Sequence, residues 1–100
     1  MPQPEIWVGV IEISWTNEKT PGVLQSAFTV VTTWAASQED FREKCSRMLE
    51  SYGWKLLGVD RANPAPINYA YSEEVEDMLE RTRNNPNAII YGTFYSYPVM

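Results

Sequence analysis

Histidine is missing from this chain of 100 residues, and cysteine occurs once, as Cys45. Nucleophilic pairs of the Ser-His-Asp and Cys-His kinds are therefore excluded, and so are metal sites that depend on histidine. One cysteine cannot form a disulfide within the chain, nor supply the thiolates of a zinc or iron–sulfur site. The glycine-rich patterns GxxxxGK[ST] and GxGxxG, which hold phosphate groups, do not occur either. We therefore expect no metal and no cofactor, and binding is a better-supported role than catalysis.

Basic residues are also few. The chain has 8 Lys and Arg against 13 Asp and Glu, which gives a net charge of −5. Because binding to nucleic acid needs a dense basic surface that displaces counterions, this balance argues against nucleic acid as a partner. It permits a basic protein partner, since opposite charge speeds association.

Long apolar runs are absent as well. No stretch approaches the ~18 apolar residues of a membrane span, so we expect no membrane partner. The opening segment MPQPEIWVGV lacks basic residues followed by a long apolar run, and together with the single cysteine this predicts a cytoplasmic protein. The length suits one core, so we expect a single domain over residues 1–100.

Alternating apolar residues predict the strands. Residues 5–15 and 24–35 have this pattern, and the segment between them contains Pro21-Gly22, a pair typical of a type II turn. These two strands are expected to pair as a long hairpin. Further strands are predicted at 54–60 and 88–97, with a short one at 67–71.

Two helices follow from capping signals and apolar periodicity. Ser37, with Asp40 three residues later, begins the first helix, and Gly53 is suited to its C-terminal cap. Ser72 begins the second helix, which ends at the segment NNPN. The apolar stripe of the first helix consists of Phe41, Cys45, Met48, Leu49 and Tyr52. The inner face of the second consists of Val75, Met78, Leu79 and Thr82. Cys45 is therefore expected to be a core thiol.

This element order predicts an α+β fold. We expect a mainly antiparallel sheet of four to five strands with two helices on one face. Without the first strand the order is βαββαβ, which is ferredoxin-like, so the first strand is an N-terminal addition. This architecture hosts many functions and assigns none.

The turn between the third strand and the second helix, at 60–71, is a candidate site for a small ligand or for catalysis. Arg61 is able to hold a carboxylate or phosphate in a fork. The alternative is a stiff, proline-rich connector in which these side chains pair or pack locally. The candidate ligand-binding residues are Asp60, Arg61, Asn63, Tyr69 and Tyr71.

The second helix carries carboxylates along its outer face. We expect this face either to dock a basic protein, as an inhibitor or immunity protein would, or to be simply solvated. The candidate partner-binding residues are Glu73, Glu76, Asp77 and Glu80.

The last strand alternates so that three tyrosines, Tyr91, Tyr95 and Tyr97, fall on one face. If the helices cover the face of Phe94, the tyrosine face remains open, and open aromatic faces are typical of interfaces. Our leading hypothesis is therefore a small acidic protein that acts by protein–protein association, as a homodimer through its open sheet face. A ligand-binding or enzymatic domain with its site at 60–71 is the alternative.

Overall fold

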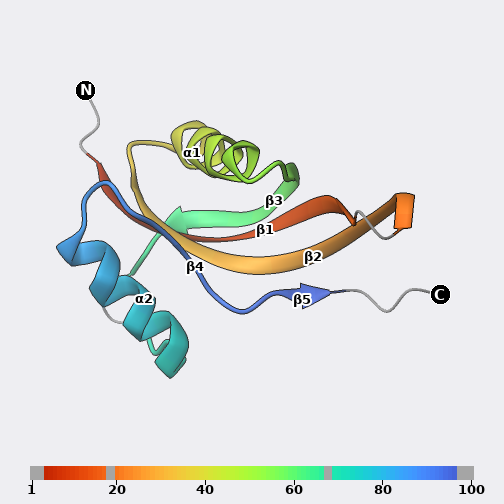
Figure 1. Ribbon diagram of the computed structural model, residues 1–100. Coiled ribbons are helices and arrows are strands. Elements are labelled where there is room, and N and C mark those ends of the chain that lie inside the picture. Colours follow the sequence, from red (N-terminus) through yellow and green to blue (C-terminus); the bar gives the residue numbers. More distant parts are fainter. Residues whose placement is uncertain (1–3, 18–19, 67–68, 97–100) are drawn as a thin grey trace.

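A computed structural model describes residues 4–17, 20–66 and 69–96 of the chain (Figure 1). Its elements, in chain order, are β1 (Glu5–Asn17), β2 (Thr20–Ala35), α1 (Gln38–Ser51), β3 (Lys55–Pro64), α2 (Glu73–Asn84), β4 (Ile89–Tyr91) and β5 (Tyr95–Ser96). Neither α1 nor α2, the helices of this described part, is long and apolar enough to cross a membrane.

The sheet is antiparallel, with the strand order β3-β1-β2-β4, and β5 also pairs with β2. The α+β class and the antiparallel sheet are therefore confirmed. The ferredoxin-like order is not, because β1 lies at the centre of the sheet, between β3 and β2, instead of being an addition to it.

Two local predictions differ from the structure. β2 begins at Thr20, so Pro21-Gly22 lies inside a strand and not at a turn. No strand is formed at residues 69–71, and the other part of the predicted short strand, 67–68, lies outside the described residues.

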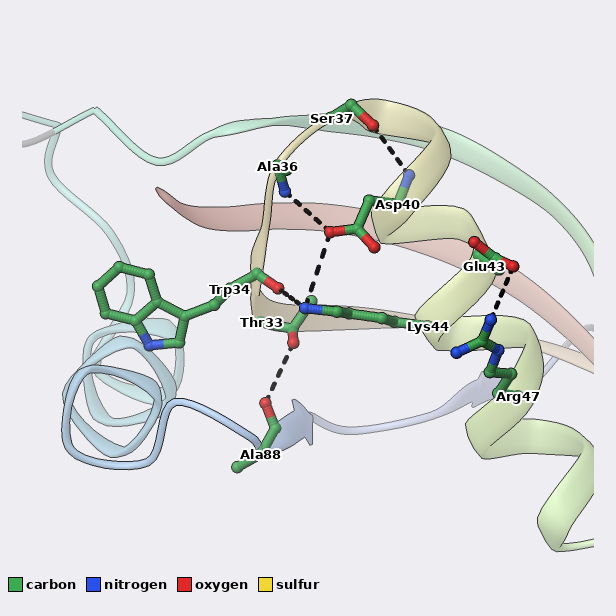
Figure 2. Close-up of polar contacts among 9 residues, drawn as sticks. All are labelled: Thr33, Trp34, Ala36, Ser37, Asp40, Glu43, Lys44, Arg47 and Ala88. Atoms are coloured by element: carbon green, nitrogen blue, oxygen red, sulfur yellow. Dashed lines mark hydrogen bonds and ion pairs between the residues drawn. The ribbon is translucent and has the colours of Figure 1, made fainter. Parts of the chain in front are cut away.

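The first helix, α1, begins where its capping signals predicted (Figure 2). The Ser37 side chain accepts a hydrogen bond from the Asp40 amide at 3.1 Å, and the Asp40 carboxylate accepts one from the Ala36 amide at 2.9 Å. Lys44, one turn along α1, donates to the carbonyl oxygen of Trp34. These contacts join the end of β2 to the first two turns of α1.

The core lies between α1 and one face of the sheet. Its buried side chains are Ile11, Ile13, Ala27, Val31, Ala35, Phe41, Cys45, Leu49 and Ala62. Cys45 is 0 % exposed, as predicted, and burial raises the pKa of its thiol to about 12. Because these strand residues alternate along β1 and β2, all of them belong to the same sheet face.

The second helix, α2, packs on the opposite face, at one end of the sheet (Figure 1). Val31 belongs to the core under α1, so the next residue, Thr32, points to the other side. There the hydroxyl of Thr32 lies 2.7 Å from the hydroxyl of Thr82, and both residues are 0 % exposed. The indole N–H of Trp34 donates to the Thr82 carbonyl at 2.7 Å. The expectation that both helices cover one face is therefore wrong, because hydroxyl and indole contacts attach α2 to the face away from α1.

Candidate functional site

The five residues predicted to form a site at 60–71 are split by the structure. Asp60, Arg61 and Asn63 lie on β3, which continues to Pro64, and they line neither of the two hollows described below. Asp60 and Arg61 lie 4.0 Å apart with side chains 63 % and 83 % exposed, so they face solvent. The prediction that these three converge with the tyrosines is wrong, because the expected turn residues are strand residues.

The two tyrosines do line a pocket, with a volume of about 630 Å³, where α2 crosses the end of the sheet. Their rings are 4.8 Å apart between centroids, and the hydroxyl of Tyr71 donates to the carbonyl of Pro66 at 3.5 Å. The lining residues are Pro4, Glu5, Ile6, Trp34, Pro64, Ala65, Pro66, Tyr69, Tyr71, Glu76, Leu79 and Arg83. This pocket therefore has a largely apolar and aromatic wall with charged groups among its lining.

Tyr71 lies near the negative charge of Glu76. The pKa of the Tyr71 hydroxyl is raised above its usual value, first by burial and then by the Tyr69 hydroxyl and the Glu76 carboxylate. The capping signals in the sequence are sufficient to predict that Glu76 lies on the second helix. Its position beside a tyrosine pair follows only from how α2 packs on the sheet.

The outer side of α2 carries a second, shallower groove of about 380 Å³, lined by Tyr71, Glu73, Glu76, Asp77, Glu80 and Arg83. It includes all four residues predicted to bind a basic partner. Asp77 is the one in an ion pair, with Arg81 at 3.0 Å. The described residues contain no group of acidic, histidine or cysteine side chains that could hold a metal ion. Because Tyr71, Glu76 and Arg83 line both hollows, the acidic groove continues into the aromatic pocket.

The tyrosines of the last strand do not form one row. Tyr91 pairs with Val31 and so lies on the α1 face, whereas Tyr95 pairs with Phe28 and lies on the opposite face. Tyr97 lies outside the described residues. The strand is interrupted after Tyr91, and in the interruption Glu74 of α2 accepts hydrogen bonds from the Thr93 amide at 2.6 Å and from its hydroxyl at 2.9 Å. The predicted single tyrosine face is therefore wrong for Tyr91 and Tyr95.

Tyr91 instead belongs to an aromatic cluster beyond the C-terminal end of α1. Ring centroids are 5.4 to 5.9 Å apart along the chain of contacts formed by Trp15, Tyr52, Trp54, Tyr91 and Phe94. Burial, followed by the neighbouring Tyr52, raises the pKa of the Tyr91 hydroxyl. The sequence gives no sign of this cluster, because its members come from two strands and two connections and share no periodicity.

The sheet face opposite α1 is only partly covered (Figure 1). α2 occupies the end that contains Thr32 and Trp34, and no other helix of the described residues lies on this face. Beyond α2, the half-buried apolar side chains of this face are Val8, Val10, Phe28 and Val30, and the half-buried polar ones are Glu12 and Ser26. Tyr95 lies beside Phe28 and is 62 % exposed. We call this surface the open sheet face.

No family model, curated protein or solved structure matches this chain. Its function is therefore inferred from these surfaces.

Proposed function

We propose that this protein acts by protein–protein association, and that it forms a homodimer through the open sheet face. The observation that carries the proposal is an apolar strip along β1 and β2 with no helix of the described part of the chain over it. Two sheets of this kind pack face to face about 10 Å apart and bury both strips. Such burial is the main favourable contribution to association.

The charges around the strip suit a second copy of the same chain. Arg61 and Asn63 lie opposite Val10 and Val8 on the open sheet face, and Glu12 lies on the same face of β1. The face therefore has a basic residue on its edge strand, β3, and an acidic residue on β1, beside Phe28. In a two-fold dimer each face meets the equivalent face of the other copy, and a face that carries both signs of charge is compatible with its own copy. A surface of one sign would repel its own copy.

Tyr95 provides the most specific test of the dimer. It is 62 % exposed beside the apolar strip, and tyrosines at the centre of interfaces often dominate binding energy. Tyr95→Asp is expected to produce monomers, as measured by sedimentation equilibrium. A wild-type protein that stays monomeric at high concentration would refute the homodimer.

A second candidate function is the docking of a basic protein on α2, in the manner of an inhibitor or immunity protein. The acidic groove favours it, because this groove continues into the aromatic pocket and so offers both charge and apolar area. Charge alone speeds association more than it deepens affinity, whereas apolar anchors lengthen the lifetime of a complex. The test is whether binding of a lysine-rich peptide is lost when Glu73, Glu76 and Glu80 are changed to Lys.

We also propose that the protein works in the cytoplasm. Cys45, the single cysteine, is buried and unpaired, which suits a reducing compartment. Fractionation of cells that express the protein would test this location.

A further inference from the structure

The pocket between α2 and the sheet offers ring and alkyl surface more than hydrogen-bonding groups. The indole N–H of Trp34 is already used by the Thr82 carbonyl, at 2.7 Å. The Tyr71 hydroxyl is directed to the Pro66 carbonyl. Ile6, Leu79 and the prolines add apolar wall. A ligand that fits this wall has an apolar stem, because polar groups along it would lose water without gaining partners.

The charged residues of α2 that line the pocket are Glu76 and Arg83. Glu76 and Arg83 are seven residues apart on α2, which separates them by about 10 Å along the helix axis. Arg83 follows Thr82, the residue bonded to Trp34, and its side chain also lines the acidic groove together with Tyr71. Glu76 lines both the pocket and the groove together with Tyr71, and the pKa of the Tyr71 hydroxyl is raised first by burial and then by Tyr69 and Glu76. The Tyr71 end of the pocket therefore combines two neighbouring tyrosine rings, tilted by 51° to each other, with a carboxylate.

Negative charge dominates around this end. The carboxylates that line the pocket or the adjoining groove are Glu5, Glu73, Glu76, Asp77 and Glu80, and the one lining guanidinium is Arg83. Arg81 offsets Asp77. A cation held against aromatic rings is stabilised by the ring quadrupole as well as by nearby carboxylates. An anion would find Arg83 alone.

We infer that this pocket binds an alkylammonium group, presented as a lysine side chain of a basic protein segment. The four-carbon stem of lysine lies along Leu79 and Trp34, and its ammonium lies between the Tyr69–Tyr71 pair and Glu76. This inference deepens the basic-partner candidate and rests on it, and it is independent of the dimer. Adjoining basic residues of the same segment occupy the acidic groove.

The experiment uses three short peptides that differ at one position, with lysine, norleucine or glutamate between glycine and serine residues. Norleucine keeps an apolar stem and removes the ammonium. Binding is followed by the NMR shift of the Trp34 indole N–H, assigned with Trp34→Phe. The lysine peptide is expected to bind at least about ten-fold more tightly than the norleucine peptide, and the glutamate peptide is expected not to bind.

Variants of the lining residues test the geometry. Glu76→Gln is expected to weaken binding of the lysine peptide about three- to five-fold, and Tyr71→Ala about two- to five-fold. Arg83→Gln is expected to strengthen it, because a repelling cation is removed. The matched control is Glu43→Gln, a carboxylate paired with Arg47 on the exposed side of α1, and it is expected to change nothing.

The possible failures are distinguishable. If the norleucine peptide binds as well as the lysine peptide, the pocket recognises only apolar groups. If the glutamate peptide binds and Arg83→Gln abolishes its binding, the pocket is an anion site. If the lysine peptide binds but ignores Glu76→Gln and Tyr71→Ala, the groove docks a basic partner and the pocket inference is wrong. If n-butylammonium shifts the NMR signal of the Trp34 indole N–H but no peptide binds, the result supports the alkylammonium pocket and refutes docking of a basic protein. If neither the lysine peptide nor n-butylammonium binds, both the pocket inference and the basic-partner candidate are refuted.

Discussion

The ring of Phe41, on α1, lies directly over the backbone of Gly9, on β1. A Cβ atom at position 9 would stand 2.7 Å from Cζ of that ring and 2.6 Å from the backbone carbonyl oxygen of Arg61. Neither neighbour has room to move, because Phe41 is 0 % exposed and the carbonyl belongs to an adjacent strand. This contact determines how closely α1 approaches the sheet.

We therefore predict that Gly9→Ala lowers the free energy of unfolding by about 2 kcal/mol or more, the range of overpacked cores. The matched control is Gly58→Ala, since a Cβ there would meet nothing within 4 Å. It is expected to change stability by less than about 1 kcal/mol. Urea unfolding of both variants measures the difference, and equal effects would contradict this account of Gly9.

The buried hydroxyl pair of Thr32 and Thr82 leads to a second prediction, about how α2 is attached. Thr82→Val removes the hydroxyl 2.7 Å from that of Thr32, which keeps its longer hydrogen bond to the Met78 carbonyl at 3.3 Å, and is expected to cost about 1–2 kcal/mol of stability. The double variant Thr32→Val with Thr82→Val is expected to cost less than the sum of the single changes, because neither hydroxyl is then left without the other. Additive effects in denaturant unfolding would show that the pair is not coupled.

Cys45 predicts a dependence of stability on alkaline pH. Burial raises the pKa of its thiol from the ordinary 9.0 to about 12 in the folded protein, so the folded state retains the proton after the unfolded state has lost it. The stabilisation of the folded state by this thiol is therefore complete below pH 9.0 and is lost as the pH rises toward about 12. The slope from this one group approaches about 1.4 kcal/mol per pH unit.

The measurement compares wild type with Cys45→Ala, because tyrosines and lysines titrate in the same range in both proteins. The stability of the variant is expected to fall less steeply above pH 9.0. The folded wild-type thiol should also react slowly with a thiol reagent at pH 8, since burial denies both access and the thiolate. Rapid reaction under native conditions would contradict the buried position.

Local features of the fold were predictable from the sequence. Three signals depend only on neighbouring residues: the pair Ser37 and Asp40, the cap Ser72, and the apolar alternation along residues 5–15. The structure contains the helices and the strand that these signals predict. The sequence cannot tell which sheet face receives α2. That depends on contacts of Thr32 and Trp34 with Thr82, residues 48 to 50 positions apart in the chain.

The candidate sites show the same division. The acidic groove was predictable because helical spacing alone places Glu73, Glu76 and Glu80 together. The aromatic pocket was only half predictable. Tyr69 and Tyr71 are close in the sequence and were predicted as site residues, whereas the packing of α2 brings Trp34 and Arg83 to the pocket. The tyrosine row failed because Glu74, a residue of α2, holds Thr93 and the strand is interrupted there.

Charge reversal on α2 tests the second candidate function. Changing Glu73, Glu76 and Glu80 to Lys is expected to abolish binding of a lysine-rich peptide, and the wild-type affinity is expected to fall as salt rises. The control is the same reversal at Glu39, Glu43 and Glu50 of α1, which alters net charge equally. Fluorescence anisotropy at two salt concentrations measures both. Equal loss in the two variants would mean that net charge, and not this groove, governs binding.

The most direct test of the central claim is sedimentation equilibrium of the wild type, Tyr95→Asp and Tyr69→Asp. Tyr69 is 63 % exposed and Tyr95 is 62 % exposed, but Tyr69 lines the pocket and lies off the open sheet face, so the two variants differ mainly in position. We predict that wild type and Tyr69→Asp are dimers at about 100 µM, and that Tyr95→Asp weakens dimerisation by about thirty-fold or more. A monomeric wild type, or dimers that Tyr95→Asp leaves intact, would contradict association through the open sheet face.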